Sequence, residues 1–433
     1  MPTLSRRSVL RGVALGSVGV FTSSLAGRVA AHPERLVVGV RSARLRRLVE
    51  RYARRVHRVL DFGGVGSAVA GEFDDAVLDR LRRRFPLAFV EPDYVATAAG
   101  GPAAHGRRTT LGRRTADEQR VPWGVERIDA DLAWTGQPSV EYAGAGVHVA
   151  VVDSGIARGH PDLRANLGDG ADFTGRLPFE SPRTRPRDWH DGNGHGTHVA
   201  GVVAAANDGR GVVGVAPGAT LHAVKVLGDA GAGFTSDIAA GIRYVARRGW
   251  QVANLSFNAV VGRDRESWLL RWACRYAADR GVLLVAAAGN QGGNVAEVVP
   301  ARYDSVLAVV ATNRSDAVAT FSNRGRGVDL AAPGVGIEST LLDGEHGTFS
   351  GTSMAAPHVA GAAALVWQAL AEETAEAEGA GETAEIGVSA AAPDAVRSRM
   401  LETAERLPGV RRARQGAGLV DAGAAATVRA TGR

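Results

Sequence analysis

The sequence predicts an α/β protein whose mostly parallel central sheet is covered by helices on both faces, preceded by a small α+β unit. From residue 121 onward, continuous apolar runs alternate with segments of helical spacing. Such unbroken runs are typical of strands in parallel sheets, which are buried on both faces. Before residue 100 the pattern changes to shorter strands and two amphipathic helices. With 433 residues, 45% of them hydrophobic, the chain is long enough to build both units.

Hydrophobic periodicity predicts the elements of the larger unit. Its buried strands are expected at 147–152, 221–226, 252–256, 282–286 and 306–310. Its helices are expected at 196–206, 236–248, 265–280, 352–370 and 393–406. Residues 371–392 are rich in Ala, Glu and Gly and lack an apolar stripe, which indicates a surface insertion.

The smaller unit, expected over 32–98, has the order of a ferredoxin-like β-α-β-β-α-β fold with one strand that the pattern does not define. Its strands are expected at 35–40, 65–73 and 89–95, and its helices at 45–60 and 75–85. Residues 99–118 are rich in Gly, Ala, Thr and Arg without periodicity, and they predict a linker. The larger unit then covers 119–433.

The first 31 residues have the pattern of an export signal. An arginine pair at 6–7 precedes an uncharged stretch over 12–27, and small residues end the segment at Ala31. The paired arginines and the dilute apolar stretch favour a twin-arginine signal over an ordinary secretory signal. The stretch is too short and too rich in Gly to span a membrane, and it has no cysteine for a lipid anchor. We therefore expect a secreted, extracellular protein that is exported folded and has no stable membrane anchor.

The positive charge of the chain belongs to its front part. The net charge is +6, yet residues 1–115 hold 21 of the 51 basic residues and only 9 of the 45 acidic ones. The remainder is therefore mildly acidic, which argues against nucleic-acid binding. The single cysteine, Cys274, excludes an internal disulfide, and its core spacing in a predicted helix indicates a small buried apolar residue. Stability must then come from core packing, metal ions or both.

Three separate segments carry residues suited to nucleophilic catalysis. Asp153 ends the apolar run VAVV, where a carboxylate needs a partner. His195 lies in the glycine-rich helix start DGNGHGTHVAG, and Ser353 lies in FSGTSMAAPHVAG at another helix start, where backbone amides can stabilise an oxyanion. Together they supply an orienting acid, a base and a nucleophile in the order Asp, His, Ser. Ala355 replaces the second Gly of an esterase elbow, which disfavours a lipase or esterase.

These motifs, together with AAAGNQ at 286–291, resemble the signatures of the subtilisin-like serine protease family (subtilases, peptidase S8). The resemblance covers roughly 119–433 apart from the predicted insertion. It implies the three-layer subtilisin-like α/β fold and a serine endopeptidase that hydrolyses proteins through an acyl-enzyme on Ser353. It further implies that His195 moves the proton, that Asp153 orients and stabilises His195, and that Asn290 and the Ser353 amide form the oxyanion hole.

The resemblance also implies how substrate is held. Substrate would add as an extended strand between two edges of the protein. The implied substrate-binding residues are Ser256, Phe257, Asn258, Gly228, Gly231 and Gly289. The family pattern has Gly at the position of Asn258, so the width and preference of the primary pocket do not carry over to this chain.

A structural calcium ion is the cofactor that the resemblance implies, and no organic cofactor is expected. The ligands would be the side chains of Gln119, Asp162 and Asp208 and the carbonyls of Ala206, Arg210 and Val212. Such an oxygen-rich shell suits calcium. The alternative is a capped turn with two surface acids.

The run FVEPDYV at 89–95 resembles the inhibitory pro-peptide (inhibitor I9 type) of these proteases. This implies an autoprocessed zymogen in which residues 32–98 inhibit the peptidase from within the chain. The cut would fall between Ala98 and Arg120. We expect a monomer whose other partners are protein or peptide substrates.

Two other functions fit the same fold: a secreted binding protein without catalysis, which an incomplete triad would mark, and a narrow processing peptidase. The His-x-x-His spacing of His195 and His198 could suggest zinc, but no third ligand matches. His198 and His358 are interpreted as non-catalytic helix residues.

Overall fold

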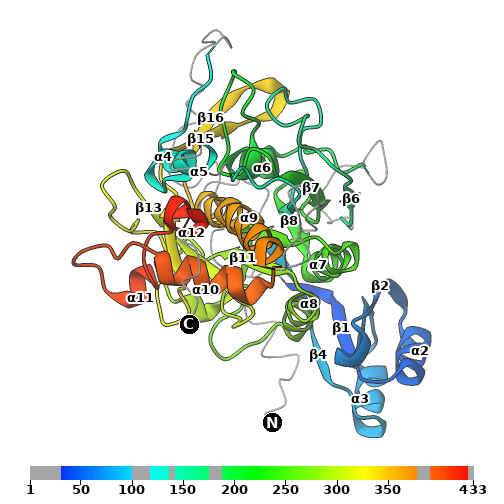
Figure 1. The fold of residues 1–433 in the computed structure, drawn as a ribbon. Coiled ribbons are helices and arrows are strands. Elements are labelled where there is room, and N and C mark those ends of the chain that lie inside the picture. Colours follow the sequence, from blue (N-terminus) through cyan, green and yellow to red (C-terminus); the bar gives the residue numbers. More distant parts are fainter. Residues whose placement is uncertain (1–30, 100–117, 136–141, 175–187, 378–390, 428–433) are drawn as a thin grey trace, which may run out of the picture.

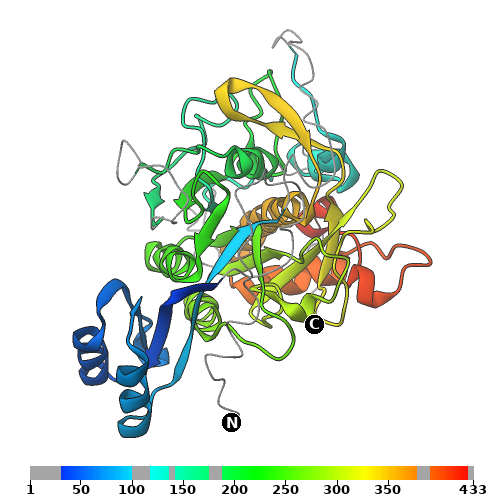
Figure 2. The ribbon, with the colours of Figure 1, turned by 180° about the vertical axis from the view of Figure 1, so that it is seen from behind.

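The structure is a computed structural model that describes residues 31–99, 118–135, 142–174, 188–377 and 391–427. Figures 1 and 2 show a larger unit of helices around a central sheet and, beside it, a smaller unit coloured blue. The predicted signal up to residue 30 and residues 100–117 of the predicted linker lie outside the described residues.

Every strand pair in the central sheet of the larger unit is parallel. The strands lie in the order β14-β13-β11-β9-β5-β7-β6. Every residue of β9, β11 and β13 is buried, which confirms the predicted apolar strands. The bounds are β5 (His148–Asp153), β6 (Ala171–Asp172), β7 (Thr220–Lys225), β9 (Val252–Leu255), β11 (Leu283–Ala287), β13 (Val306–Thr312) and β14 (Leu330–Pro333).

Two hydrophobic cores cover the two faces of this sheet. Along β5, Val149 and Val151 belong to the core that includes α6 and α9, whereas Ala150 and Val152 belong to the core that includes α7 and α8. This alternation makes the predicted three-layer α/β fold (Figure 1). These helices are α6 (His195–Ala204), α7 (Thr235–Arg248), α8 (Trp268–Ala278) and α9 (Thr352–Ala377).

Shorter elements complete the larger unit. The remaining helices are α4 (Trp123–Arg127), α5 (Ala130–Trp134), α10 (Pro393–Thr403), α11 (Arg412–Gln415) and α12 (Ala422–Thr427). The remaining strands are β8 (Ala232–Phe234), β10 (Phe257–Val260), β12 (Val298–Val299), β15 (Ile337–Thr340) and β16 (His346–Phe349).

Helix α9 corrects a predicted boundary. It was expected to end at residue 370 but continues to Ala377, and Ala371 is 1% exposed. Residues 371–377 therefore extend the core helix, because Ala and Glu are strong helix formers even without a long apolar stripe. Residues 378–390 of the predicted insertion lie outside the described part. By length and composition α9 could cross a membrane, but 94% of its apolar window is buried inside the protein, as in a core helix.

The smaller unit has the predicted β-α-β-β-α-β order. Its elements are β1 (Ala31–Val40), α2 (Ala43–Tyr52), β2 (Arg55–Asp61), β3 (Ser67–Glu72), α3 (Asp75–Arg84) and β4 (Phe89–Ala98). The strands form an antiparallel sheet in the order β4-β1-β3-β2. Leu45, Val49, Leu78 and Leu81 of the two helices pack on one face of it.

The helix predicted over 45–60 is wrong in its second half. The helix ends at Tyr52, and residues 55–61 form β2, the strand that the sequence pattern did not define. A β-bulge between Val56 and Arg58 shifts the pairing of β2 with β3, so the alternation expected of a strand is broken. Pairing with the following strand β3, and not the spacing of apolar residues, decides this segment.

Strand β4 joins the two units. Its first half pairs with β1, and its last residues pair with β8 and β10 of the larger unit. Asp93, which is fully buried, accepts hydrogen bonds from Ser236 N (2.9 Å) and Thr235 Oγ1 (3.1 Å) at the start of α7. Arg35 completes the contact with two hydrogen bonds to the same carboxylate. The acid therefore satisfies amide and hydroxyl donors at a helix N-terminus.

Candidate active site

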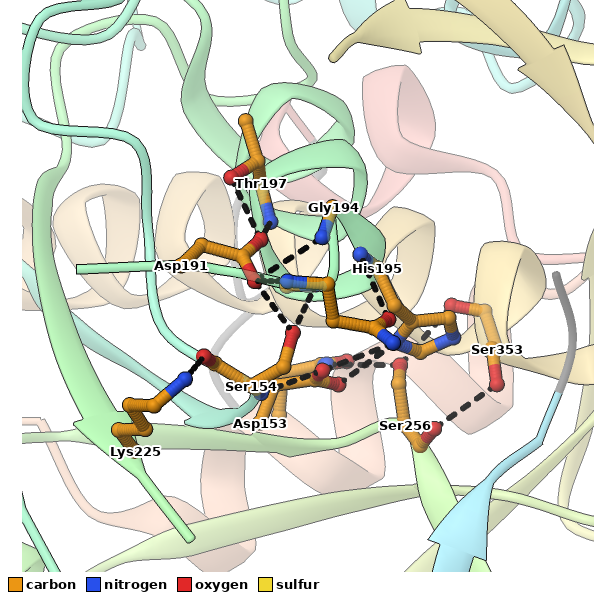
Figure 3. A network of polar contacts seen from close by, with 12 residues as sticks. Asp153, Ser154, Asp191, Gly194, His195, Thr197, Lys225, Ser256 and Ser353 are labelled. Atoms are coloured by element: carbon orange, nitrogen blue, oxygen red, sulfur yellow. Dashed lines mark hydrogen bonds and ion pairs between the residues drawn. The ribbon is translucent and has the colours of Figure 1, made fainter. Parts of the chain in front are cut away.

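The three residues expected to act together lie at the carboxyl edge of the sheet (Figure 3). Asp153 is the last residue of β5, His195 is the first of α6, and Ser353 is the second of α9. Their exposed fractions are 0%, 2% and 0%. The carboxyl ends of parallel strands share one edge, where α/β proteins place their active sites.

Asp153 and His195 form a buried pair. Nδ1 of His195 lies 2.8 Å and 3.0 Å from the two carboxylate oxygens of Asp153. Ser154 N donates to the same carboxylate at 2.7 Å. Burial alone would lower the pKa of His195, but the charge and hydrogen bond of Asp153 outweigh it and raise this pKa above 6.5. The pair thus favours the protonated ring, which a base must become during proton transfer.

Ser353 does not hydrogen-bond to His195 in this arrangement. Its Oγ donates to the Ser256 carbonyl oxygen at 2.8 Å. Nε2 of His195 has no hydrogen-bond partner within the described ranges, so its lone pair is open to accept a proton. A rotation of the serine side chain would be needed to bring the two together, and such bonds often tighten only when substrate reacts.

Two donors converge on the carbonyl oxygen of Ala99. Ser353 N donates to it at 3.2 Å and Asn290 Nδ2 at 2.5 Å. The other end of the Asn290 amide is fixed, because Oδ1 accepts from Thr352 N (2.9 Å) and Thr352 Oγ1 (2.8 Å). The amide is therefore oriented with its donor toward Ala99. Two preorganised donors at one carbonyl form the geometry of an oxyanion hole.

The segment that ends at Ala99 lies between two strand edges. Thr97 pairs with Ala232 of β8 on one side and with Asn258 of β10 on the other, both antiparallel. Ala98 N donates to the Gly231 carbonyl oxygen (2.9 Å) and Ala99 N to that of Ser256 (3.1 Å). An extended peptide bound in this way is recognised through its main chain.

The structure separates the predicted substrate-binding residues into two groups. Ser256, Phe257, Asn258 and Gly231 bond to or pair with the segment that ends at Ala99. Gly228 closes the turn that carries Gly231, since Gly231 N donates to the Gly228 carbonyl oxygen at 2.8 Å. Gly289 has φ of +99°, and its amide donates to Thr352 Oγ1 at 3.1 Å. Gly228 and Gly289 therefore contribute to the site indirectly, through Gly231 and Thr352.

Asp191 is a positioning residue that the sequence motif did not single out. Its carboxylate accepts from Gly194 N (3.0 Å), from Thr197 N (2.9 Å) and from Ser154 Oγ (2.9 Å). It thereby caps α6 and ties the helix that begins with His195 to the residue after Asp153. An acid a few residues before a helix start is a capping signal that the sequence does contain.

Lys225 is a second residue that sequence reasoning missed. It ends β7 beside Asp153 and is 1% exposed. Its Nζ donates to the Ser154 carbonyl oxygen and lies 3.3 Å from Asp229 Oδ1. A lysine inside the apolar run 221–226 is the signal that could have found it, because a buried ammonium needs such partners.

The other histidines of the motifs are structural. Nε2 of His198 lies 3.1 Å from the Ile337 carbonyl oxygen, and Nδ1 of His358 lies 2.7 Å from that of Met354. Burial lowers the pKa of His198 to about 3 and that of His358 to about 4, so both rings are neutral. In the described part of the chain no group of three His, Cys, Asp or Glu side chains could hold a metal ion. Cys274 is buried, as predicted.

The three segments of the predicted calcium site meet, and some of the predicted ligand oxygens accept hydrogen bonds from the protein. Gln119 Nε2 donates to the Ala206 carbonyl oxygen at 2.8 Å. Asp162 accepts from Val212 N at 2.8 Å, and Nε2 of His346 lies 2.7 Å from the same oxygen. Protein groups therefore donate hydrogen bonds to oxygens that a calcium ion would need as ligands.

Asp208 also departs from the expected arrangement. Its carboxylate lies 2.9 Å from Arg210 Nη2 in an ion pair at the surface. Asp208 is thus engaged at the surface, whereas Asp162 is only 2% exposed. A calcium site at these residues stays a prediction.

Comparison with known proteins gives consistent matches. The profile of the subtilase family matches residues 144–418. Subtilisin Savinase of Lederbergia lenta is 48% identical over 251 residues, which are 58% of this chain and 85% of that protein. For the alkaline protease of Alkalihalobacillus alcalophilus the identity is also 48% over 251 residues, covering 58% of this chain and 60% of the relative. Subtilisin E of Bacillus subtilis is 41% identical over 303 residues, 69% of this chain and 70% of that protein.

Proposed function

Since the chain belongs to the subtilase family of serine endopeptidases, we propose that it is a secreted protease, made as a precursor that cuts itself and hydrolyses proteins through an acyl-enzyme on Ser353. One observation carries the proposal. The carbonyl of Ala99 lies against the two donors, Ser353 N and Asn290 Nδ2, that would stabilise an oxyanion. The chain's own segment therefore lies where a substrate would lie.

In the proposed mechanism Ser353 Oγ attacks the carbonyl carbon of the residue held in this position. His195 Nε2 takes the hydroxyl proton, and the charged ring is stabilised by Asp153. The oxyanion is held by Ser353 N and Asn290 Nδ2. When the C–N bond breaks, His195 passes the proton to the leaving nitrogen, and water then hydrolyses the acyl-enzyme with the same base.

The first substrate would be the precursor itself, cut between Ala99 and Gly100. Strand β4 delivers Ala99 to the donors, and residues 32–99 would be released as the pro-domain. Until it leaves, this product fills the cleft and inhibits the enzyme. Residues 100–118 would then remain on the enzyme. The proposed cut is near the start of the interval from Ala98 to Arg120.

Secretion is proposed from the sequence alone. The arginine pair at 6–7 and the small residues before His32 are the features that support export of a folded chain. The proposal includes a monomer without membrane anchor or nucleic-acid partner, which acts on proteins and peptides.

The cut is tested by expressing the full precursor and measuring the intact mass and N-terminal sequence of the product in the culture medium. We expect a mature chain that begins at Gly100. The His195→Ala precursor lacks the base and should stay uncut. A product that begins at Gln119, or a His195→Ala chain cut like the wild type, would show that another site or another protease matures the enzyme. Product confined to the cells would contradict secretion.

The pro-domain contact predicts a dependence of stability on pH. Glu91 of β4 is 5% exposed and accepts from Trp268 N (2.7 Å) and Leu269 N (3.1 Å) at the start of α8. Burial raises the pKa of Glu91 to about 8, although these bonds act in the opposite direction. The folded precursor thus holds a proton that the unfolded chain, with a glutamate pKa of 4.5, releases.

The stabilising effect of this proton is complete below pH 4.5 and is lost as the pH rises toward about 8. The Tm of a precursor kept uncut by Ser353→Ala should therefore fall over this window. Adding Glu91→Gln should flatten that fall, because the amide does not titrate. Equal slopes in the two proteins would contradict the assignment to Glu91.

A further inference from the structure

Asn258 presents an unused hydrogen-bond donor beside the bound segment. The residue lies in β10 and is 5% exposed, yet its Nδ2 has no hydrogen-bond partner among the residues that the structure describes. Buried polar groups are nearly always paired, so an unpaired one needs an explanation. Part of its cover is the pro-segment itself, whose Thr97 pairs with Asn258 across the strands. When that segment leaves, the donor opens toward the substrate site.

The pleat of the sheet determines which subsite the amide faces. Asn258 pairs with Thr97 and Phe257 with Ala98, and Ala99 N continues the ladder to the Ser256 carbonyl oxygen. Side chains alternate along a strand, so Asn258 shares a face with Thr97 and Ala99. The core clusters agree with this division. Phe257 and Ala98 pack in the core with α7 and α8, whereas Ala99 belongs to the other core.

The distance between these positions explains why the donor is unpaired. Asn258 and Ala99 are diagonal neighbours across the antiparallel pair, a relation that places Cα atoms about 7–8 Å apart. The methyl group of Ala99 is too short to reach the amide and has no acceptor. A longer side chain at that position, with an oxygen at its tip, would meet the donor.

We propose that Asn258 is a specificity-determining residue, whose Nδ2 donates to a side-chain oxygen of the substrate residue that occupies the position of Ala99. The preferred class is then peptides with a polar, uncharged residue such as Asn before the cut bond. The proposal rests on the proposed protease function. It also follows that Ala99 leaves this donor unused, so the pro-segment is held less tightly than the best substrate.

The test measures kcat/KM of the mature enzyme on peptides that keep Val-Ala-Thr-Ala from residues 95–98 and end in Asn or Leu before the cut bond. Asn and Leu have nearly the same shape, so the ratio isolates the hydrogen bond. We expect Asn to be preferred about tenfold or more. Asn258→Leu removes the donor at matched size and should reduce or invert the ratio. A peptide ending in Ala serves as the reference for each protein.

The outcomes separate this inference from the function on which it rests. A preference for Asn that disappears in Asn258→Leu supports it. Cleavage of both peptides at equal rates by the wild type, or the same ratio in Asn258→Leu, overturns it while the protease function stands. If the wild type cleaves no peptide and stays uncut, both fail. If Asn258→Leu does not fold, the wild-type ratio of kcat/KM for the Asn and Leu peptides tests the inference alone.

Discussion

Replacing Ser353 by alanine is expected to lower kcat by about 10⁶-fold, which is the size of loss known for the same change in subtilisin. The reason is that no acyl-enzyme can form, whereas Ser353 N and Asn290 still hold the carbonyl. Substrate binding should change little, because the strand edges that pair with the peptide are untouched. The kinetics are measured on a peptide substrate, and the intact mass should show the precursor uncut.

Ser350→Ala is the matched control for this experiment. Ser350 lies three residues earlier, and its Oγ accepts from Gly336 N at 2.9 Å without touching the site. Its loss should change kcat only a few-fold. Wild-type activity in Ser353→Ala would mean that another group is the nucleophile.

Replacing Asp153 by asparagine is expected to lower kcat by roughly 10⁴-fold, as in the trypsin triad. The amide no longer stabilises the charged ring, and it can hold His195 in the wrong tautomer. The pH profile gives a second readout. Activity needs neutral His195, so it falls as the pH drops through a pKa that Asp153 raises above 6.5. In Asp153→Asn this fall should move to lower pH.

Asp191→Asn is the comparison for that variant. Asp191 caps α6 and does not touch the ring, although its charge also raises the pKa of His195 to a smaller degree. We expect a loss of stability with a smaller shift of the pH profile. If the profile of Asp153→Asn did not move, the carboxylate would not set the pKa of His195.

The sequence predicted the sheet of the larger unit because its strands are buried on both faces. Runs such as 306–310, observed as Val306–Thr312, need no knowledge of their neighbours to be recognised. The opposite holds for β2, whose residues have a broken alternation and become a strand only by pairing with β3. Strands β15 and β16, which the sequence pattern did not predict, are likewise defined by their pairing with each other.

The residues of the candidate active site divide in a similar way. Asp153, His195 and Ser353 were predicted because each lies in a motif that its own segment carries. Lys225 and Asp191 act through partners in other segments, and a sequence does not show such partners directly. The predicted calcium ligands stay a prediction, because adjacency of segments does not determine the direction of each side chain.

The pairing of strand β4 also affects how soon the enzyme can become active. It pairs with β1 of the smaller unit and with β8 and β10 of the larger one, so the proposed cut after Ala99 would remove a covalent link but none of these hydrogen bonds. The buried carboxylate of Asp93 stays paired as well. If the precursor cuts itself as proposed, the interval between the cut and the first turnover of another substrate would be governed by how slowly the pro-domain dissociates. Under the proposed function, the onset of activity would then depend on this interface and not on the rate of the chemical step.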